Sequence, residues 1–287
     1  MSNDALVLAG GGVAGIAWET GVLFGLQQAM PRLTEAILSH GTTLIGTSAG
    51  STVAAQLAGG AALEDLFALQ TGEGGSEILV DLDMEKFAAM MGEALLGDPS
   101  PAEFRRRIGR IARNAETPPA AARREVIKAR LGVREWPERP LLITAVDTDS
   151  GELRVFDDTS GVSLVDAVTA SCAVPGVWPT VEIAGHHYMD GGIRTIANAD
   201  LAAGANRVLI LIPSHEVTPL GSALTQAEID ALAGSRLFTV YADSDSLAAF
   251  GANPLDPRTR GPAARAGYNL GERLAGDIAN FWDQDRA

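Results

Sequence analysis

The sequence predicts an α/β protein whose mainly parallel central sheet is covered by helices on both faces. Apolar, strand-like runs alternate with helical stretches over residues 5–58 and again over residues 141–212. Such alternation is typical of strand–helix–strand units, which build parallel sheets. The chain has 287 residues, of which 46% are hydrophobic, and this suffices for one large domain with a sizeable core.

The expected elements follow in chain order. An apolar run at 5–9 predicts the first strand, and a helix begins near Gly15. The second strand is expected at 43–45, before a run of small residues at 51–57 that favours a helix. Further strands are expected at 141–146, 180–184, 187–189, 207–212 and 236–241, and further helices at 164–170 and 197–203.

The segment from about 64 to 140 departs from this alternation. We predict a single domain over residues 1–287 with a helical cap inserted there, whose helices span 83–96, 102–114 and 120–131 between prolines. Residues 102–134 hold ten basic and three acidic residues, a net charge of +7 in a chain of net charge −14. A basic patch on a helix could dock on an anionic membrane, although a solvated helix face is the plainer explanation. The arginines proposed for this contact are Arg105, Arg106, Arg107 and Arg110.

A G-x-S-x-G pentapeptide occupies residues 46–50, between the second expected strand and its helix. In a nucleophile elbow, a sharp strand-to-helix turn exposes one side chain, and residues without bulky side chains let the turn close. Ser48 is therefore the candidate nucleophile, with Gly46 and Gly50 as supporting positions. The alternative is a serine that only caps the helix.

Three consecutive glycines, Gly10, Gly11 and Gly12, follow the first expected strand. Their amides can form a nest for an anion at a helix N-terminus, so we expect an oxyanion hole here, completed by the amide of Ala49. The pattern G-x-G-x-x-G, which ends at Gly15, also permits a dinucleotide site, but that site needs an acidic residue after a second strand. Glu35 has no strand before it. A purely structural glycine turn is the third possibility.

A third motif, Asp190-Gly191-Gly192, follows two short expected strands. Gly191 and Gly192 would let the Asp190 carboxylate approach another loop closely and leave amides free to hold it. An ordinary Asp-Gly hairpin turn is the alternative explanation.

Taken in this order, the three motifs resemble the patatin-like phospholipase family, and the resemblance continues through residues 170–179. It covers about residues 5–58 and 140–213. It implies a three-layer bacterial patatin-like acyl hydrolase with a catalytic dyad of Ser48 and Asp190. The family often has Arg or Lys where this chain has Ala14, a departure that concerns phospholipid specificity more than ester hydrolysis.

The expected function is a serine acyl hydrolase, a lipid esterase of the phospholipase A or lysophospholipase type. Asp190 would act as the base for Ser48, and acyl lipids or esters would be the substrates. A catalytically silent lipid-binding or fatty-acyl-binding module on the same fold is one alternative. A Ser-His-Asp esterase is another, because Asp147 and His187 satisfy the usual chain order. The histidines to consider for it are His40, His186, His187 and His215.

Composition narrows the remaining possibilities. No cofactor or metal is expected, and the single cysteine, Cys172, excludes an internal disulfide and is interpreted as a packing residue. No apolar run reaches the about 18 to 20 residues of a membrane span, and no signal peptide is recognised. We therefore expect a cytoplasmic protein, peripheral at the membrane if the arginines bind lipid. The acidic balance argues against nucleic acid as a partner.

Overall fold

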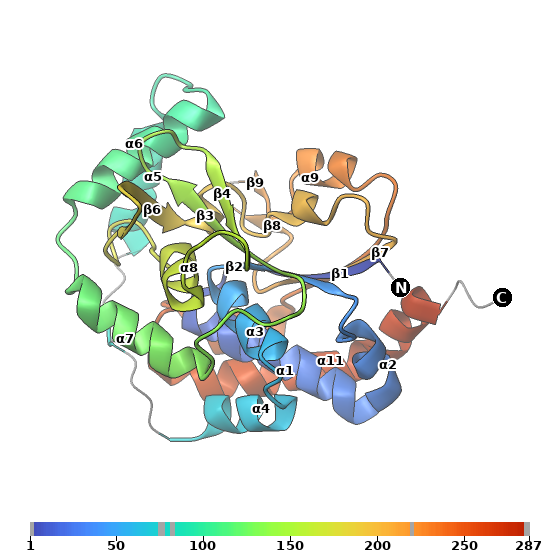
Figure 1. Cartoon of the computed structure of the whole chain (residues 1–287). Coiled ribbons are helices and arrows are strands. Elements are labelled where there is room, and N and C mark those ends of the chain that lie inside the picture. Colours follow the sequence, from blue (N-terminus) through green and yellow to red (C-terminus); the bar gives the residue numbers. More distant parts are fainter. Residues whose placement is uncertain (1–2, 74–77, 81–83, 219–220, 284–287) are drawn as a thin grey trace.

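The computed structural model describes residues 3–73, 78–80, 84–218 and 221–283. Its strands are β1 (Asp4–Leu8), β2 (Thr43–Thr47), β3 (Leu141–Asp147), β4 (Leu153–Phe156), β5 (Val181–Ile183), β6 (His186–Asp190), β7 (Arg207–Ile212), β8 (Val217–Thr218), β9 (Gly221–Ser222) and β10 (Arg236–Tyr241). The central sheet is eight-stranded in the order β10-β7-β1-β2-β3-β6-β5, with β4 paired to β3. Figure 1 shows this sheet between α9 on one side and α1, α3 and α11 on the other. Strands from β10 to β3 run parallel, whereas β4, β5 and β6 pair antiparallel. This mostly parallel sheet flanked by helices confirms the predicted fold class.

Helices cover both faces of the sheet. Those of the larger layer are α1 (Gly12–Ala29), α2 (Pro31–Ile37), α3 (Ala49–Ala58), α4 (Leu63–Thr71), α8 (Leu164–Ser171), α10 (Ser244–Phe250) and α11 (Arg260–Asp283). Side chains alternate between the two faces of a strand. In β1, Leu6 and Leu8 therefore join the core under this layer, whereas Ala5 and Val7 join a second core. That second core lies under the short helix η2 (Ala199–Ala202) and α9 (Gln226–Ala231).

Glycines let α11 lie directly against α1. A Cβ atom added at Gly25 would lie 2.1 Å from the Tyr268 carbonyl oxygen, and one added at Gly271 would lie 2.1 Å from that of Val22. No larger residue fits at either position without moving backbone. This contact fixes α1, whose N-terminus follows the glycine loop.

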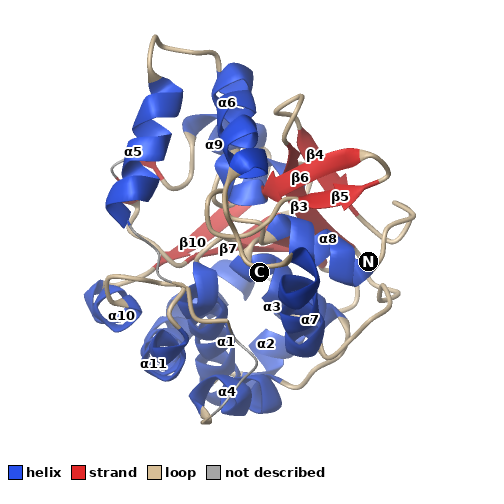
Figure 2. Ribbon diagram, turned by 90° about the vertical axis from the view of Figure 1, so that its left-hand side faces the viewer, coloured by secondary structure: helices blue, strands red, loops and turns tan. Residues whose placement is uncertain are grey.

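The helices of the segment predicted as an insertion, about residues 64–140, lie in different parts of the molecule. Helix α4 packs on α1 and α11 and so belongs to the main helical layer. Helices α5 (Met84–Leu95) and α6 (Pro101–Asn114) lie side by side and project from the opposite end of the molecule (Figure 2). Helix α7 (Ala120–Leu131) returns to pack on α3 and α8. The first helix was expected to begin at residue 83, which lies outside the described residues.

One local prediction was wrong. The helix expected over 197–203 is reduced to the single 3-10 turn η2, because Asn198 adopts a left-handed conformation (φ 51°) and its side chain bonds to backbone carbonyls instead. Strand β4 was not expected, and it forms by antiparallel pairing with β3. Among the described helices, none has the length and apolar character needed to span a membrane.

Candidate active site

Ser48 occupies a strained turn between β2 and α3. Its φ of 52° and ψ of −113° are rare for a residue with a side chain. A Cβ atom at Gly50 would lie 2.0 Å from the Leu8 carbonyl oxygen, and one at Gly46 would lie 2.5 Å from the Ser51 Cα. Both glycines are therefore required for the turn to close, which is the geometry of a nucleophile elbow.

Asp190 meets this serine from the end of β6. The Ser48 hydroxyl donates to Asp190 Oδ2 at 2.6 Å, and the Gly192 amide donates to Asp190 Oδ1 at 2.8 Å. A Cβ atom at Gly191 would lie 2.4 Å from the Thr144 hydroxyl, so this glycine is also required. The Asp-Gly-Gly segment is therefore not only a turn, because it also holds the Asp190 carboxylate against Ser48.

The sheet register explains how residues 142 positions apart meet. Thr47 pairs with Thr144 on one side of β3, and Asp190 pairs with Ala145 on the other. Strand β3 therefore lies between the strand that carries Ser48 and the strand that carries Asp190.

Asp190 lies in an environment that suits a base. Its side chain is buried, and burial raises the pKa of its carboxyl to about 6. The hydrogen bonds from Ser48 and Gly192 and the positive charge of Arg123 oppose this rise by stabilising the carboxylate. A pKa near 6 leaves the group ionised at neutral pH while making it a better proton acceptor than an exposed aspartate.

The glycine loop offers amides at the same place. Gly12, Val13 and Ala49 line a pocket that opens to solvent, together with Ser48. Within the described part of the chain, the amides of Gly11, Gly12, Val13 and Ala49 have no acceptor, whereas the Gly10 amide donates to the Ile196 carbonyl at 2.8 Å. Gly10 is therefore not available as an oxyanion donor, contrary to expectation. Gly15 serves packing, because a Cβ atom there would lie 3.1 Å from Pro213 Cγ.

Neighbouring side chains hold the elbow. The Ser48 amide donates to the hydroxyl of Ser171 at 2.8 Å, and the Ser48 carbonyl accepts bonds from Ser51 Oγ at 2.6 Å and Cys172 Sγ at 3.2 Å. Cys172 is buried, and burial raises the pKa of its thiol. It therefore packs under the elbow in its neutral form.

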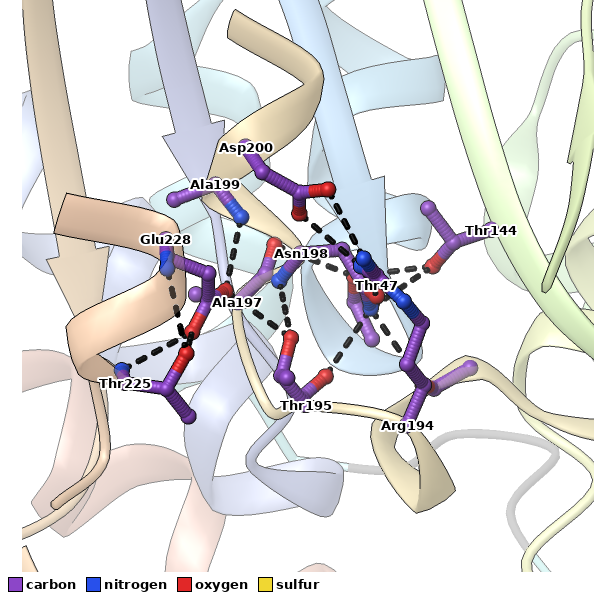
Figure 3. A network of polar contacts seen from close by, with 11 residues as sticks. Thr47, Thr144, Arg194, Thr195, Ala197, Asn198, Ala199, Asp200, Thr225 and Glu228 are labelled. Carbon is purple, nitrogen blue, oxygen red and sulfur yellow. Dashed lines mark hydrogen bonds and ion pairs between the residues drawn. The ribbon is translucent and has the colours of Figure 1, made fainter. Parts of the chain in front are cut away.

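A polar network surrounds Asn198, whose partners include the sequence neighbours of Ser48 and Asp190 (Figure 3). Asn198 Nδ2 donates to Thr47 Oγ1 at 3.1 Å and to the Gly191 carbonyl at 3.2 Å. Its Oδ1 accepts a bond from Arg194 at 2.9 Å, and Arg194 forms an ion pair with Asp200 at 2.7 Å. One fully buried amide therefore bonds to the residue before Ser48 and to the residue after Asp190.

The histidines lie elsewhere. His186 Nδ1 lies 2.9 Å from Asp147 Oδ2 on a hairpin where the His186 side chain is 63% exposed, and His187 approaches Thr180. None of the four histidines bonds to Ser48 or Asp190 in the described structure. Its described residues also contain no group of three or more His, Cys, Asp or Glu that could hold a metal ion.

The structure also describes the residues behind the dinucleotide alternative and the basic patch. Glu35 lies in α2 and not at the end of a strand, so the dinucleotide site lacks its acidic residue. In α6, Glu103 accepts bonds from Arg106, Arg107 and Arg110, and Arg105 donates to the Gly151 carbonyl. The four arginines therefore lie on one helix, and Glu103 offsets part of their positive charge.

The chain belongs to the patatin-like phospholipase family, whose model matches residues 6–203 and so includes the glycine loop, Ser48 and Asp190. The family places the chain among lipid acyl hydrolases. No curated protein sequence matches it significantly.

Two of the solved structures that are similar to this one illustrate the match. They are VipD from Legionella pneumophila (15% identity, TM-score 0.45, covering 96% of this chain and 67% of VipD) and the type III effector protein ExoU (18% identity, TM-score 0.38, covering 96% of this chain and 53% of ExoU). The chain thus spans about two thirds of the first and about half of the second.

Sequence reasoning missed three residues of the site. Ser171 lies in the segment 170–179, which was noted only as part of a resemblance, and Asn198 was placed in a helix. Arg123 was counted in a basic stretch, yet it is 5% exposed and lines the pocket. Only the mutual placement of distant segments identifies all three.

Proposed function

We propose that this protein is a serine acyl hydrolase of the phospholipase A or lysophospholipase type, in which Ser48 is the nucleophile and Asp190 the base. The observation that carries the proposal is the 2.6 Å hydrogen bond from Ser48 Oγ to a buried carboxylate whose pKa is raised to about 6. A strained elbow and a nearby group of open amides support the same chemistry.

In the first half-reaction, Ser48 Oγ attacks the ester carbonyl carbon while its proton passes to Asp190 Oδ2. The oxyanion that forms accepts hydrogen bonds from the amides of Gly12 and Ala49, with Gly11 and Val13 as further donors. Both α1 and α3 begin at this point, so their positive dipole ends stabilise the same charge. Collapse of the tetrahedral intermediate breaks the ester C–O bond, and Asp190 returns the proton to the leaving alcohol.

In the second half-reaction, Asp190 takes a proton from water as the water oxygen attacks the acyl-enzyme carbonyl. The second tetrahedral intermediate releases the fatty acid, and the proton on Asp190 returns to Ser48 Oγ. The Gly192 amide keeps the second carboxylate oxygen fixed, so Oδ2 stays directed at the serine in both steps. One carboxyl group thus serves both half-reactions.

Two variants test the dyad. Ser48→Ala and Asp190→Asn should each lower kcat/KM for a short p-nitrophenyl ester by about three orders of magnitude or more, without additivity, because the two residues act as one unit. A fluorophosphonate probe should label Ser48 in the wild type, as seen by mass spectrometry. Absence of labelling and of hydrolysis would support a lipid-binding module instead.

Asp147→Asn and His187→Ala are the matched controls. They remove the acid and the base of the Ser-His-Asp alternative, and both should retain activity. Loss of activity in either variant would favour that triad over the dyad.

We also propose peripheral contact with anionic membranes, for a protein that works in the cytoplasm. Arg107 donates to the carbonyls of Ala94 and Leu96 and so lies at the end of α5, where the side chains of Leu95 and Leu96 are exposed. Apolar side chains beside arginines suit the boundary between headgroups and acyl chains. This contact would bring the pocket to its lipid substrate.

A further inference from the structure

One turn of the chain contacts both members of the proposed dyad. It consists of Ser171, Cys172 and Ala173, at the C-terminal end of α8. The Ser48 amide donates to Ser171 Oγ at 2.8 Å, and Cys172 Sγ donates to the Ser48 carbonyl at 3.2 Å. The Asp190 amide donates to the Ala173 carbonyl at 2.9 Å. Three consecutive residues therefore hold the main chains of Ser48 and Asp190, which are 142 positions apart.

This turn is itself held by the core. All three of its residues are buried. The Cys172 amide donates to the Val168 carbonyl at 3.0 Å, and the Ala173 amide donates to the Ala170 carbonyl at 3.2 Å. Helix α8 packs on β3 and β6 and on the helices α3 and α7. The position of Ser171 Oγ is therefore set by the packing of α8 and not by the elbow that it contacts.

The carbonyl of Ser48 has several partners, whereas its amide relies on one. The carbonyl accepts bonds from Ser51 Oγ at 2.6 Å and from the Ser51 amide at 3.0 Å, besides the bond from Cys172. Among the residues that the structure describes, only Ser171 accepts from the Ser48 amide. Loss of one bond to the carbonyl leaves the others in place. Loss of the Ser171 hydroxyl leaves a buried amide without an acceptor, which is costly.

The amide of Ser48 matters because the backbone is strained at this residue. A φ of 52° with a ψ of −113° persists only where the surrounding structure holds it. The angle φ, which the bond to the amide helps to fix, also decides where the side chain points. Here it directs Ser48 Oγ to Asp190 Oδ2 at 2.6 Å. A turn released at the amide can relax toward a commoner conformation, and Oγ then leaves the carboxylate.

We infer that Ser171 is a positioning residue for the reaction: its hydroxyl holds the Ser48 amide so that Ser48 Oγ stays directed at Asp190. This inference rests on the proposed acyl hydrolase function and adds to it a residue that does not touch the reacting atoms. Ser171 is not among the described residues that line the pocket, so it acts through the elbow and not through the substrate.

A matched pair of serine variants tests this role. Ser171→Ala should lower kcat for a short p-nitrophenyl ester about ten- to a hundredfold with little change in KM, because small displacements of reacting groups are costly. Ser246→Ala is the control, since it removes an equally buried hydroxyl that accepts a bond from Trp18 Nε1 at 2.9 Å, and it should keep the wild-type kcat. Ser171→Thr retains a hydroxyl and should recover most of the loss. A wild-type kcat in Ser171→Ala would overturn the inference.

The pH profile distinguishes positioning from support of the fold. The bond from Ser48 lowers the pKa of Asp190, so a displaced Ser48 should raise that pKa. In Ser171→Ala, the acid limb of kcat/KM should therefore move to higher pH by about half a unit to one unit. A Ser171→Ala protein that is less stable in urea but keeps the wild-type limb and kcat would make Ser171 a structural residue only. If Ser171→Ala does not fold, Ser171→Cys, which offers a weaker acceptor, should show the same changes to a smaller extent.

Hydrogen exchange at the Ser48 amide, followed by NMR, separates this inference from the proposed reaction. Relative to the amide of Leu44 in β2, this amide should exchange about tenfold faster or more in Ser171→Ala than in the wild type. Ser246→Ala should leave the ratio unchanged. Should the wild type neither hydrolyse the ester nor react with a fluorophosphonate, the proposed function fails while this measurement still decides whether Ser171 holds the elbow. Equal ratios in the wild type and Ser171→Ala would overturn the inference.

Discussion

Asn198 Nδ2 donates a hydrogen bond to the hydroxyl of Thr47 at 3.1 Å, immediately before the candidate nucleophile. The same amide group donates to the carbonyl of Gly191, immediately after Asp190. Figure 3 shows this side chain among Thr47, Thr144, Arg194 and Thr195. Because Asn198 is fully buried and bonds at both ends of its amide, it links the segment that carries Ser48 to the segment that carries Asp190.

We therefore expect Asn198→Asp to lower kcat about ten- to a hundredfold with little change in KM, because small displacements of reacting groups are costly. Asp tolerates the left-handed conformation but cannot donate to Thr47 or Gly191. Steady-state kinetics and the rate of fluorophosphonate labelling measure the effect. Asn114→Asp, at an exposed helix end, is the control. Unchanged kinetics in a folded Asn198→Asp protein would show that the network is only structural.

The pH dependence should report on Asp190. Its carboxylate must be ionised to accept the serine proton, so kcat/KM should rise as pH increases through about 6 and then level off. Arg123→Gln should move this limb to higher pH, because the positive charge that lowers the pKa of Asp190 is lost. The limb should also persist when each histidine is replaced by Ala. A limb that disappears with one histidine would contradict the assignment to Asp190.

Gly12→Ala should lower kcat more than it raises KM. Gly12 has a φ of 65°, and a Cβ atom there would lie 2.8 Å from Leu255 Cδ2 and 2.9 Å from the Pro254 carbonyl oxygen. The loop must shift, and loss of one oxyanion donor costs about 2.7 to 4 kcal/mol in the transition state. Gly60→Ala is the control, since Gly60 has a φ of 82° with no atom within 4 Å of the added Cβ. Equal losses in both variants would point to general backbone strain. Saturable binding of NAD by the wild type would instead revive the dinucleotide hypothesis.

Glu19 makes stability depend on pH. The Glu19 side chain is fully buried, and burial raises the pKa of its carboxyl well above the ordinary value, although an interaction with the backbone of Ala9 opposes this rise. The folded protein therefore retains a proton that the unfolded chain releases. At pH values above the pKa that Glu19 has in the unfolded chain, this group should lower the free energy of unfolding by up to about 1.4 kcal/mol per pH unit. This decrease should end once the pH exceeds the pKa that Glu19 has in the folded protein.

Glu19→Gln should remove this contribution and leave unfolding less dependent on pH. Urea unfolding at several pH values from 4 upward measures it, with the exposed Glu35→Gln as the control. A Glu19→Gln protein with the same pH dependence as the wild type would refute the assignment.

Membrane contact can be tested with vesicles. Replacing Arg105, Arg106, Arg107 and Arg110 by Gln should weaken co-sedimentation with anionic vesicles, since each basic residue contributes up to about 1 kcal/mol near such a surface. Salt should weaken wild-type binding in the same way. Hydrolysis of a short soluble ester is the control readout and should hardly change. Salt-insensitive or absent binding would leave these arginines as a solvated helix face.

Local patterns in the sequence were enough to predict the class of fold, and the family resemblance of the motifs singled out Ser48 and Asp190, whose side chains are hydrogen-bonded in the structure. Strand formation, turn closure at glycine and apolar alternation depend on neighbouring residues, so they can be read along the chain. The same patterns failed at 197–203, because Asn198 obtains its partners from Thr47 and Gly191, which are remote in sequence.

Only the tertiary structure decides which groups from distant segments of the chain contact one another. The amide of Gly10 is occupied by Ile196, a contact that no local pattern contains, so the loop offers fewer donors than its three glycines suggest. Arg123 belongs to a helix whose sequence reads as a basic surface, and only the packing of α7 on α3 and α8 brings it to Ser48. Burial, and with it the raised pKa of Asp190, likewise arises from all the segments packed around a residue and not from its neighbours in the chain.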